Sequence, residues 1–146
     1  MERKVQDLKD EGLKIATVNG SFDLMTAGHL EILYQGSQTA DVLIVALNSD
    51  ESIKKYKSPK RPIIPLYDRL RMMTAIEFVD FVTWFEETDP IQLLEIIKPH
   101  VHVNGSDYGA DCIEAPTVIK NGGRVEIIHR GSDLSTSEII KKCASL

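Results

Sequence analysis

Cysteine is scarce in this sequence, and the two cysteines, Cys112 and Cys143, stand far apart. They form no CxxC pair and have no metal-ligand spacing, so nothing supports a disulfide framework or a zinc site. We expect both thiols to be reduced and to have no functional role. Long hydrophobic runs are also missing, since no stretch approaches the roughly 18 apolar residues of a membrane span and residues 1–8 lack the apolar core of a signal peptide. The sequence therefore predicts a cytoplasmic protein that does not enter a membrane.

A positively charged surface is missing as well, because 17 Lys and Arg face 22 Asp and Glu and the net charge is -5. Binding along a nucleic-acid backbone relies on excess positive charge, so the composition argues against a nucleic-acid partner, although a single nucleotide could bind locally. The chain has 146 residues, of which 42% are hydrophobic and 27% charged, as is usual for one globular domain. We therefore expect residues 1–146 to form a single domain.

Short β-branched or apolar stretches alternate with helical patterns along the chain. After a lead-in helix that ends at Gly12, we expect strands at 14–19, 41–47, 81–84, 101–104 and 124–128. We expect helices at 28–40, 66–77, 89–99, 112–121 and 135–143. Residues 51–65 are basic and rich in proline, which favours a mobile loop. This order predicts an α/β fold, a Rossmann-like doubly wound parallel sheet that binds ligands beyond the carboxyl ends of its strands.

The segment from Asn19 to His29, NGSFDLMTAGH, follows the first expected strand and opens the first long helix. Glycine lets a backbone approach an anion closely, and the N–H groups at a helix N-terminus favour negative charge. His29 could donate a hydrogen bond to a phosphate oxygen from this first turn. Taken singly, Gly20 reads as a turn, Phe22 as a core residue and His29 as a surface cap. Their order and spacing together favour a phosphate-binding site.

A second group of phosphate-binding residues precedes the last expected helix, in the segment RGSDLSTS that ends at Ser137. Hydroxyl and N–H groups at a helix start can hold β- and γ-phosphates, and a guanidinium offers them a planar fork. The alternative is a plain N-cap at Ser135 with Glu138 completing a capping box. We predict that this segment and the early glycine turn meet across one cleft and hold a triphosphate.

Other polar residues have weaker patterns. Asn104-Gly105-Ser106-Asp107-Tyr108 follows the fourth expected strand and is either a base-reading segment or an ordinary Asn-Gly turn. The three histidines outside the first motif have no partners at metal spacing, so we expect no protein metal site and interpret them as strand or surface residues: His100, His102 and His129. Trp84 and Phe85 are expected to pack at the edge of the core.

The first motif resembles the signature G-x-F-D-x-x-H-x-G-H of the cytidylyltransferase-like nucleotidyltransferase superfamily. Gly20, Phe22, Asp23, Gly28 and His29 match this signature, whereas Thr26 stands where its first histidine is expected. In that superfamily both histidines stabilise the phosphate being transferred, and loss of one such donor costs about 10² to 10³ in rate. The resemblance therefore leaves three alternatives: a slower enzyme, compensation by another cation, or nucleotide binding without turnover.

The resemblance also implies a role for each matching residue. A lysine of the basic segment, Lys57 or else Lys55, would reach the α-phosphate, and Arg69 would help to organise the site. Arg130 would face the phosphates as a catalytic residue, together with His29 and Lys57. The remaining implied ligands of the nucleotide are Ser21, Asp23, Asn104 (where relatives have lysine), Gly105, Asp107, Ser135, Thr136 and Ser137.

Similarity extends from Lys14 to Lys142 and is greatest to the adenylyltransferase domain of bacterial ADP-heptose synthases. Those enzymes transfer AMP from ATP to D-glycero-β-D-manno-heptose 1-phosphate for lipopolysaccharide cores, and the resemblance implies a standalone form without the kinase domain. Arg130 is more similar to glycerol-3-phosphate cytidylyltransferases, so CTP and an alcohol phosphate remain an alternative. The resemblance further implies Mg²⁺, brought with ATP as the substrate, and a homodimer.

Overall fold

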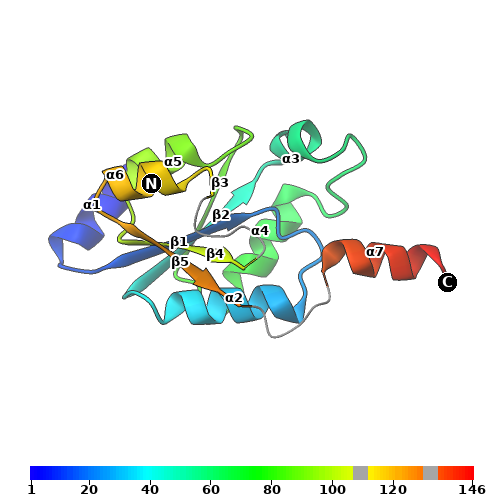
Figure 1. Cartoon of the computed structure of the whole chain (residues 1–146), viewed down its shortest axis with the longest axis horizontal. Helices are drawn as coiled ribbons and strands as arrows, with labels where there is room; N and C mark the ends of the chain where they lie inside the picture. Colours follow the sequence, from blue (N-terminus) through cyan, green and yellow to red (C-terminus); the bar gives the residue numbers. More distant parts are fainter. Residues whose placement is uncertain (107–111, 130–134) are drawn as a thin grey trace.

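A five-stranded sheet forms the centre of the molecule in a computed structural model that describes residues 1–106, 112–129 and 135–146 (Figure 1). Every neighbouring pair of strands is parallel. The strands are β1 (Ile15–Gly20), β2 (Val42–Asn48), β3 (Phe81–Phe85), β4 (Val101–Gly105) and β5 (Arg124–Ile128). The helices are α1 (Glu2–Asp10), α2 (Ala27–Ser37), α3 (Asp50–Tyr56), α4 (Leu66–Thr74), α5 (Ile91–Ile97), α6 (Ala115–Lys120) and α7 (Thr136–Ala144).

The strands lie in the order β3-β2-β1-β4-β5. β1 is the central strand, and the chain winds outward from it first through β2 and β3 and then through β4 and β5. In doubly wound sheets the point where the winding reverses leaves a crevice at the carboxyl ends of the strands. The predicted Rossmann-like parallel fold is therefore confirmed, and the reversal lies between β1 and β4.

Hydrophobic side chains alternate along β1 and β2 and so pack two separate cores, one on each face of the sheet. Ala16 and Val18 belong to a cluster that also contains Leu33 of α2 and Met73 of α4. Ile15 belongs to a second cluster, built with α1 and α5; its buried members are Val5, Leu8, Ile15, Val42, Ile44 and Ile97. Both faces of the parallel sheet are thus covered, which explains why β2 is buried along its whole length.

The expectation of a loop over residues 51–65 is wrong in its first part, because α3 occupies Asp50–Tyr56. Ser49 caps this helix by accepting a hydrogen bond from the Ser52 N–H at 3.1 Å, and Ile53 is fully buried against the sheet. The prolines restrict only the residues after the helix. Proline disfavours a helix at its own position and at the residue before it, so it does not act against α3, which ends at Tyr56.

Two smaller expectations also need correction. α4 ends at Thr74 rather than at residue 77, and α6 begins at Ala115 rather than at residue 112. Trp84 was expected at the core edge but is 51% exposed, whereas Phe85 is 4% exposed and packs as expected. β3 is an edge strand of the sheet, and its neighbouring residues point to opposite faces, so Phe85 is covered whereas Trp84, on the other face, remains exposed at this edge.

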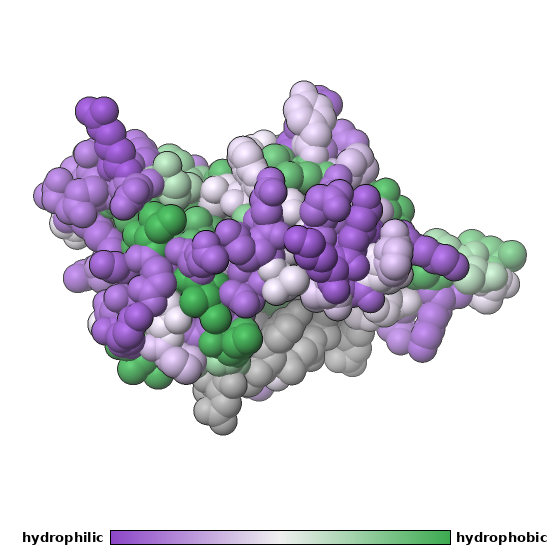
Figure 2. Space-filling model, turned by 90° about the horizontal axis from the view of Figure 1, so that it is seen from above, coloured by the Kyte–Doolittle hydropathy of each residue, from purple (hydrophilic) through white to green (hydrophobic). Residues whose placement is uncertain are grey.

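Hydrophilic side chains cover most of the face seen from above, and α7 projects from the body at the right of the view (Figure 2). α7 contains no buried residue. Across the described ranges, no helix combines the length and the apolar character needed to cross a bilayer.

Candidate functional site

A pocket of about 480 Å³ opens at the carboxyl ends of β1 and β4, where the winding of the sheet reverses. Its lining includes the glycine turn Gly20–Phe22 after β1 and the residues 135–137 at the start of α7. The Thr136 hydroxyl donates to the carbonyl oxygens of Asp23 (2.9 Å) and Leu24 (3.0 Å), which joins the two segments directly. The two motifs, separated by more than a hundred residues, therefore meet across one cleft, as the sequence predicted.

The turn after β1 is tightly folded. A Cβ atom on Gly20 would lie 3.1 Å from Cε2 of Phe22, so glycine leaves room for the phenyl ring to lie close to the strand end. That ring meets the imidazole of His29 edge-on, with 5.5 Å between the ring centres. Phe22 and Leu24 both have left-handed backbones, with φ of 50° and 53°. Such conformations cost about 1 to 2 kcal/mol per residue, so contacts elsewhere must hold this turn in place.

Asp23 supplies many of those contacts. Its carboxylate is 1% exposed and accepts hydrogen bonds from the backbone N–H groups of Ile63 (2.8 Å) and Ile64 (2.9 Å). Arg61 donates to it through Nε at 3.1 Å. Asp23 does not line the pocket. It therefore fixes the segment after α3 against the turn, and we assign it no direct contact with a ligand.

Arg69 occupies a similar position on α4 and is the largest fully buried side chain. Its guanidinium donates to three carbonyl oxygens at 2.8 Å each, those of Ser21, Asn48 and Ile64. It also forms an ion pair with Asp50 at 2.7 Å. A buried guanidinium is tolerated when its donors are satisfied in this way. Arg69 does not line the pocket but joins the carboxyl ends of β1 and β2 to α4.

Thr26 and His29 form the N-terminal cap of α2. The Thr26 hydroxyl accepts from the His29 N–H at 3.3 Å, and the Thr26 N–H donates to Nδ1 of His29 at 2.9 Å, which makes a capping box. Because Nδ1 accepts a hydrogen bond, the proton of the neutral imidazole is on Nε2. His29 lines the pocket, whereas Thr26 and the buried Gly28 do not. Thr26 thus orients the histidine and is not placed to contact a phosphate itself.

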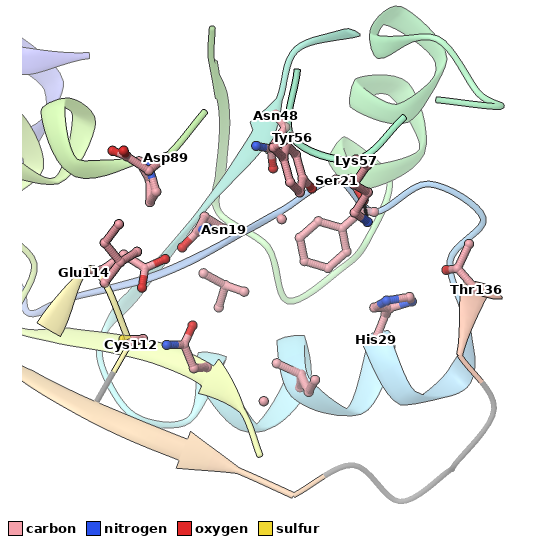
Figure 3. A pocket seen from close by; sticks show the side chains of 18 of the residues that line it. Asn19, Ser21, His29, Asn48, Tyr56, Lys57, Asp89, Cys112, Glu114 and Thr136 are labelled. Atoms are coloured by element: carbon pink, nitrogen blue, oxygen red, sulfur yellow. Dashed lines mark hydrogen bonds between the residues drawn. The ribbon is translucent and has the colours of Figure 1, made fainter. Parts of the chain in front are cut away.

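Lys57 lies at the C-terminal end of α3 and points into the pocket near Ser21 (Figure 3). Its Nζ donates to the Ser21 hydroxyl at 3.3 Å. Burial, followed by the neighbouring Arg61 guanidinium, lowers the pKa of Lys57, and the Asp23 carboxylate acts in the opposite direction. Lys55, the alternative lysine, does not line the pocket. The unexpected helix α3 is what brings Lys57 to this place.

The far end of the pocket is formed by residues that sequence reasoning did not select: Asn19, Asp89, Cys112 and Glu114. Figure 3 shows them grouped away from His29, Lys57 and Thr136. Cys112, expected to have no functional role, lines the pocket, and burial together with a hydrogen bond to Glu114 raises the pKa of its thiol. Asn19 lies near the carboxyl end of β1, at the predicted reversal point, and could have been selected on that ground, but Cys112 and Glu114 belong to no recognisable motif.

The remaining predicted ligands divide into two groups. Asn104 and Gly105, at the end of β4, line the pocket. Asp107 and Arg130 lie outside the described residues. Among the residues that the structure does describe, no three His, Cys, Asp or Glu side chains come together as a metal site.

A family model described as cytidylyltransferase-like matches residues 17–142 of the chain. The chain is 41% identical over 143 residues to the bifunctional protein HldE of Methylobacillus flagellatus and 39% identical over 139 residues to that of Hahella chejuensis. These matches cover 97% and 94% of the chain but 29% of each relative, so the chain spans less than a third of the relatives' length.

Two solved structures share the fold. A lipopolysaccharide core biosynthesis protein from Thermoplasma volcanium matches with a TM-score of 0.66 and 24% identity, over 83% of this chain and 98% of that one. Pantoate-beta-alanine ligase from Francisella tularensis, complexed with beta-gamma ATP and beta-alanine, matches with a TM-score of 0.58 and 15% identity, over 99% and 76%. At these identities the likeness extends to the fold alone.

Proposed function

The chain belongs to the cytidylyltransferase-like family and is a nucleotidyltransferase, and we propose that it transfers AMP from ATP to D-glycero-β-D-manno-heptose 1-phosphate. The products would be ADP-heptose, for lipopolysaccharide cores, and pyrophosphate. The resemblance to the adenylyltransferase domain of ADP-heptose synthases, over nearly the whole chain, supports this choice of acceptor.

The observation that carries the proposal is the meeting of the two phosphate-binding segments in one pocket, with His29 and Lys57 beside them. In the proposed reaction, a phosphate oxygen of the acceptor attacks the α-phosphorus of ATP while the bond to pyrophosphate breaks on the opposite side. No covalent enzyme intermediate is needed. Nε2–H of His29 and the ammonium of Lys57 would stabilise charge on the transferring phosphate, and the N–H groups at the start of α7 would hold the distal phosphates.

Mg²⁺ would enter as part of the ATP substrate. Mg²⁺ prefers oxygen ligands, so the phosphate oxygens of ATP would hold it. The ion would neutralise charge on the phosphates, and the protein residues named above would position them.

The test is pyrophosphate release from ATP or CTP with the heptose 1-phosphate or glycerol 3-phosphate as acceptor. We expect turnover with ATP and the heptose phosphate. His29→Gln should lower kcat by about 10² to 10³, the usual cost of one preorganised donor. The matched control is His100→Asn, because His100 lies at the other end of β4 and the Asn oxygen can replace its Nδ1, which accepts from the Ile15 N–H. Preference for CTP would instead assign a cytidylyltransferase for an alcohol phosphate.

Thr26 bears on the alternative of binding without turnover. Because Thr26 caps α2 and does not line the pocket, its hydroxyl cannot take over the contact made by a histidine. We propose that Lys57 compensates for the missing imidazole. If ATP binds but no acceptor is turned over, and Thr26→His restores turnover, the chain is a nucleotide-binding protein that has lost catalysis. A homodimer and a cytoplasmic location remain predictions; analytical ultracentrifugation tests the first.

A further inference from the structure

The end of the pocket away from α7 contains two buried polar atoms that lack a partner in the described part of the chain. They are Oδ1 of Asn19 and Nδ2 of Asn104. Both residues line the pocket, and Asn104 is only 7% exposed. A buried polar group without a hydrogen bond costs about 1 to 3 kcal/mol, so native proteins retain few of them. Their position at the wall of a pocket indicates that a ligand supplies the missing partners.

The chemistry of this end fits hydroxyl groups. One amide atom is an acceptor and the other a donor, and a hydroxyl group can donate to the first and accept from the second. Glu114, 8% exposed and hydrogen-bonded by the Cys112 thiol, adds a carboxylate that accepts from hydroxyls and repels phosphate. Asp89, which also lines the pocket, adds a second carboxylate. This end therefore suits an uncharged, hydroxyl-rich group.

The geometry of the reaction places the acceptor at the same end. If the start of α7 holds the distal phosphates, pyrophosphate leaves toward α7, and the attacking oxygen must approach the α-phosphorus from the opposite side. Asn19 and Glu114 lie on that side, across the pocket from Thr136 (Figure 3). An acceptor whose phosphate reaches the α-phosphorus would extend its sugar toward them.

We propose that Asn19, Asn104 and Glu114 form a subsite that binds the hydroxyl groups of the acceptor sugar and thereby selects a polyhydroxylated phosphate over a shorter alcohol phosphate. In this proposal Asn104, which the resemblance implied to be a ligand of the nucleotide, contacts the acceptor instead. This inference rests on the proposed function for the identity of the acceptor. It goes beyond that function by naming the residues that distinguish a sugar from other phosphorylated alcohols.

The first experiment measures binding, which does not require turnover. Isothermal titration calorimetry first measures the affinity of the protein for an ATP analogue that has a methylene between its α- and β-phosphorus. It then measures the affinity of the heptose 1-phosphate for the complex of protein and analogue. Asn104→Ala should weaken acceptor binding about three- to tenfold, as expected for one neutral hydrogen bond, and leave analogue binding unchanged. Asn121→Ala is the matched control, because Asn121 bonds to Glu95 and Thr117 outside the pocket. Asn19→Ala serves as the second variant if Asn104→Ala does not fold.

The second experiment compares acceptors. Heptose 1-phosphates that each lack one hydroxyl should bind the wild type several-fold more weakly than the complete heptose 1-phosphate does. For the hydroxyl that Asn104 contacts, the Asn104→Ala variant should bind the complete and the deoxygenated compound with equal affinity. A purely structural role of Asn104 would leave the discrimination intact. Any of three results would overturn the subsite. The variant Asn104→Ala could bind the acceptor as tightly as the wild type does, or it could lose at least as much affinity for the ATP analogue as for the acceptor. The third such result is that the wild type does not bind the heptose phosphate. Acceptor binding that depends on Asn104, without pyrophosphate release, would instead refute the proposed function and leave the subsite standing.

Discussion

Mild acid should destabilise this protein through His102, a completely buried residue of β4. Its Nδ1 lies 2.8 Å from the Thr17 hydroxyl, and its Nε2 has no hydrogen-bond partner within the described residues. Burial lowers the pKa of His102 from 6.5 to about 4, although the Glu114 carboxylate acts in the opposite direction. The imidazole is therefore neutral in the folded protein at pH values where it would take up a proton in the unfolded chain.

The size of the effect follows from the two pKa values. The folded pKa lies below the unfolded one, so between pH 6.5 and pH 4 the unfolded chain binds a proton that the folded protein does not. The stabilising contribution of the neutral histidine is fully present above pH 6.5 and is lost as the pH falls toward 4. At about 1.4 kcal/mol for each pH unit of difference, the loss is about 3 kcal/mol. This is a large fraction of the stability of an ordinary domain.

Urea unfolding at half-unit steps from pH 7.5 to pH 4 measures this loss in the wild type and in His102→Asn, which cannot take up a proton. The variant should be less stable at pH 7.5, because it leaves a cavity, but its stability should fall less steeply in acid. Carboxylates titrate in both proteins, so the difference between the two curves isolates the histidine. Parallel curves would refute the reasoning.

Three further changes should have specific effects. Asp23→Asn should lower the free energy of unfolding by about 1 to 3 kcal/mol, because the amide nitrogen cannot accept the backbone hydrogen bond that one of the two carboxylate oxygens accepts; wild-type stability in urea would contradict this. Lys57→Ala should weaken ATP binding about tenfold to a hundredfold in calorimetry, as expected for a charged hydrogen bond, whereas exposed Lys60→Ala should not. Because the pKa of Lys57 is lowered, wild-type affinity should fall with rising pH before the ordinary lysine value of 10.5 is reached, and Lys57→Arg should remove that fall. Gly123→Ala should lower the free energy of unfolding by about 1 to 3 kcal/mol and with it the melting temperature, since the new Cβ would overlap a backbone carbonyl oxygen. Gly36→Ala is its control and should not lower the melting temperature, because its Cβ would meet neighbouring atoms only at ordinary distances from 3.5 Å.

The sheet and the meeting of the two motifs could be predicted because both depend on local patterns and one general rule. Short β-branched stretches specify the strands, and parallel strands bring their carboxyl ends to one edge. α3 could also have been predicted: Ser49 is a good cap, and Asp50 and Glu51 precede Lys54 and Lys55 in the order that favours a helix. The prolines that follow lie downstream of this helix and do not oppose it.

The roles of Asp23 and Arg69 could not be derived from the local pattern in the same way. Each is a charged residue that would normally be placed on the surface, and each is buried because distant backbone groups satisfy it. Those partners come from the segment after α3 and from the ends of β1 and β2. The resemblance implied an organising role for Arg69, but the contacts that perform it appear only once the chain is folded.

The distribution of charge in the pocket favours one orientation of the acceptor. Lys57 and Arg61 line it near the glycine turn, while Asp89 and Glu114 line it at the other end. A sugar with a single phosphate can place that phosphate beside the cations and its hydroxyls beside the carboxylates. A sugar with phosphates at both ends would bring one of them against Glu114, which is nearly removed from water and therefore repels anions more strongly than an exposed carboxylate would. If the proposed subsite binds the acceptor sugar, the two carboxylates that fit its hydroxyl groups would also act against bisphosphorylated sugars, and the pocket would select its acceptor by charge as well as by hydrogen bonding.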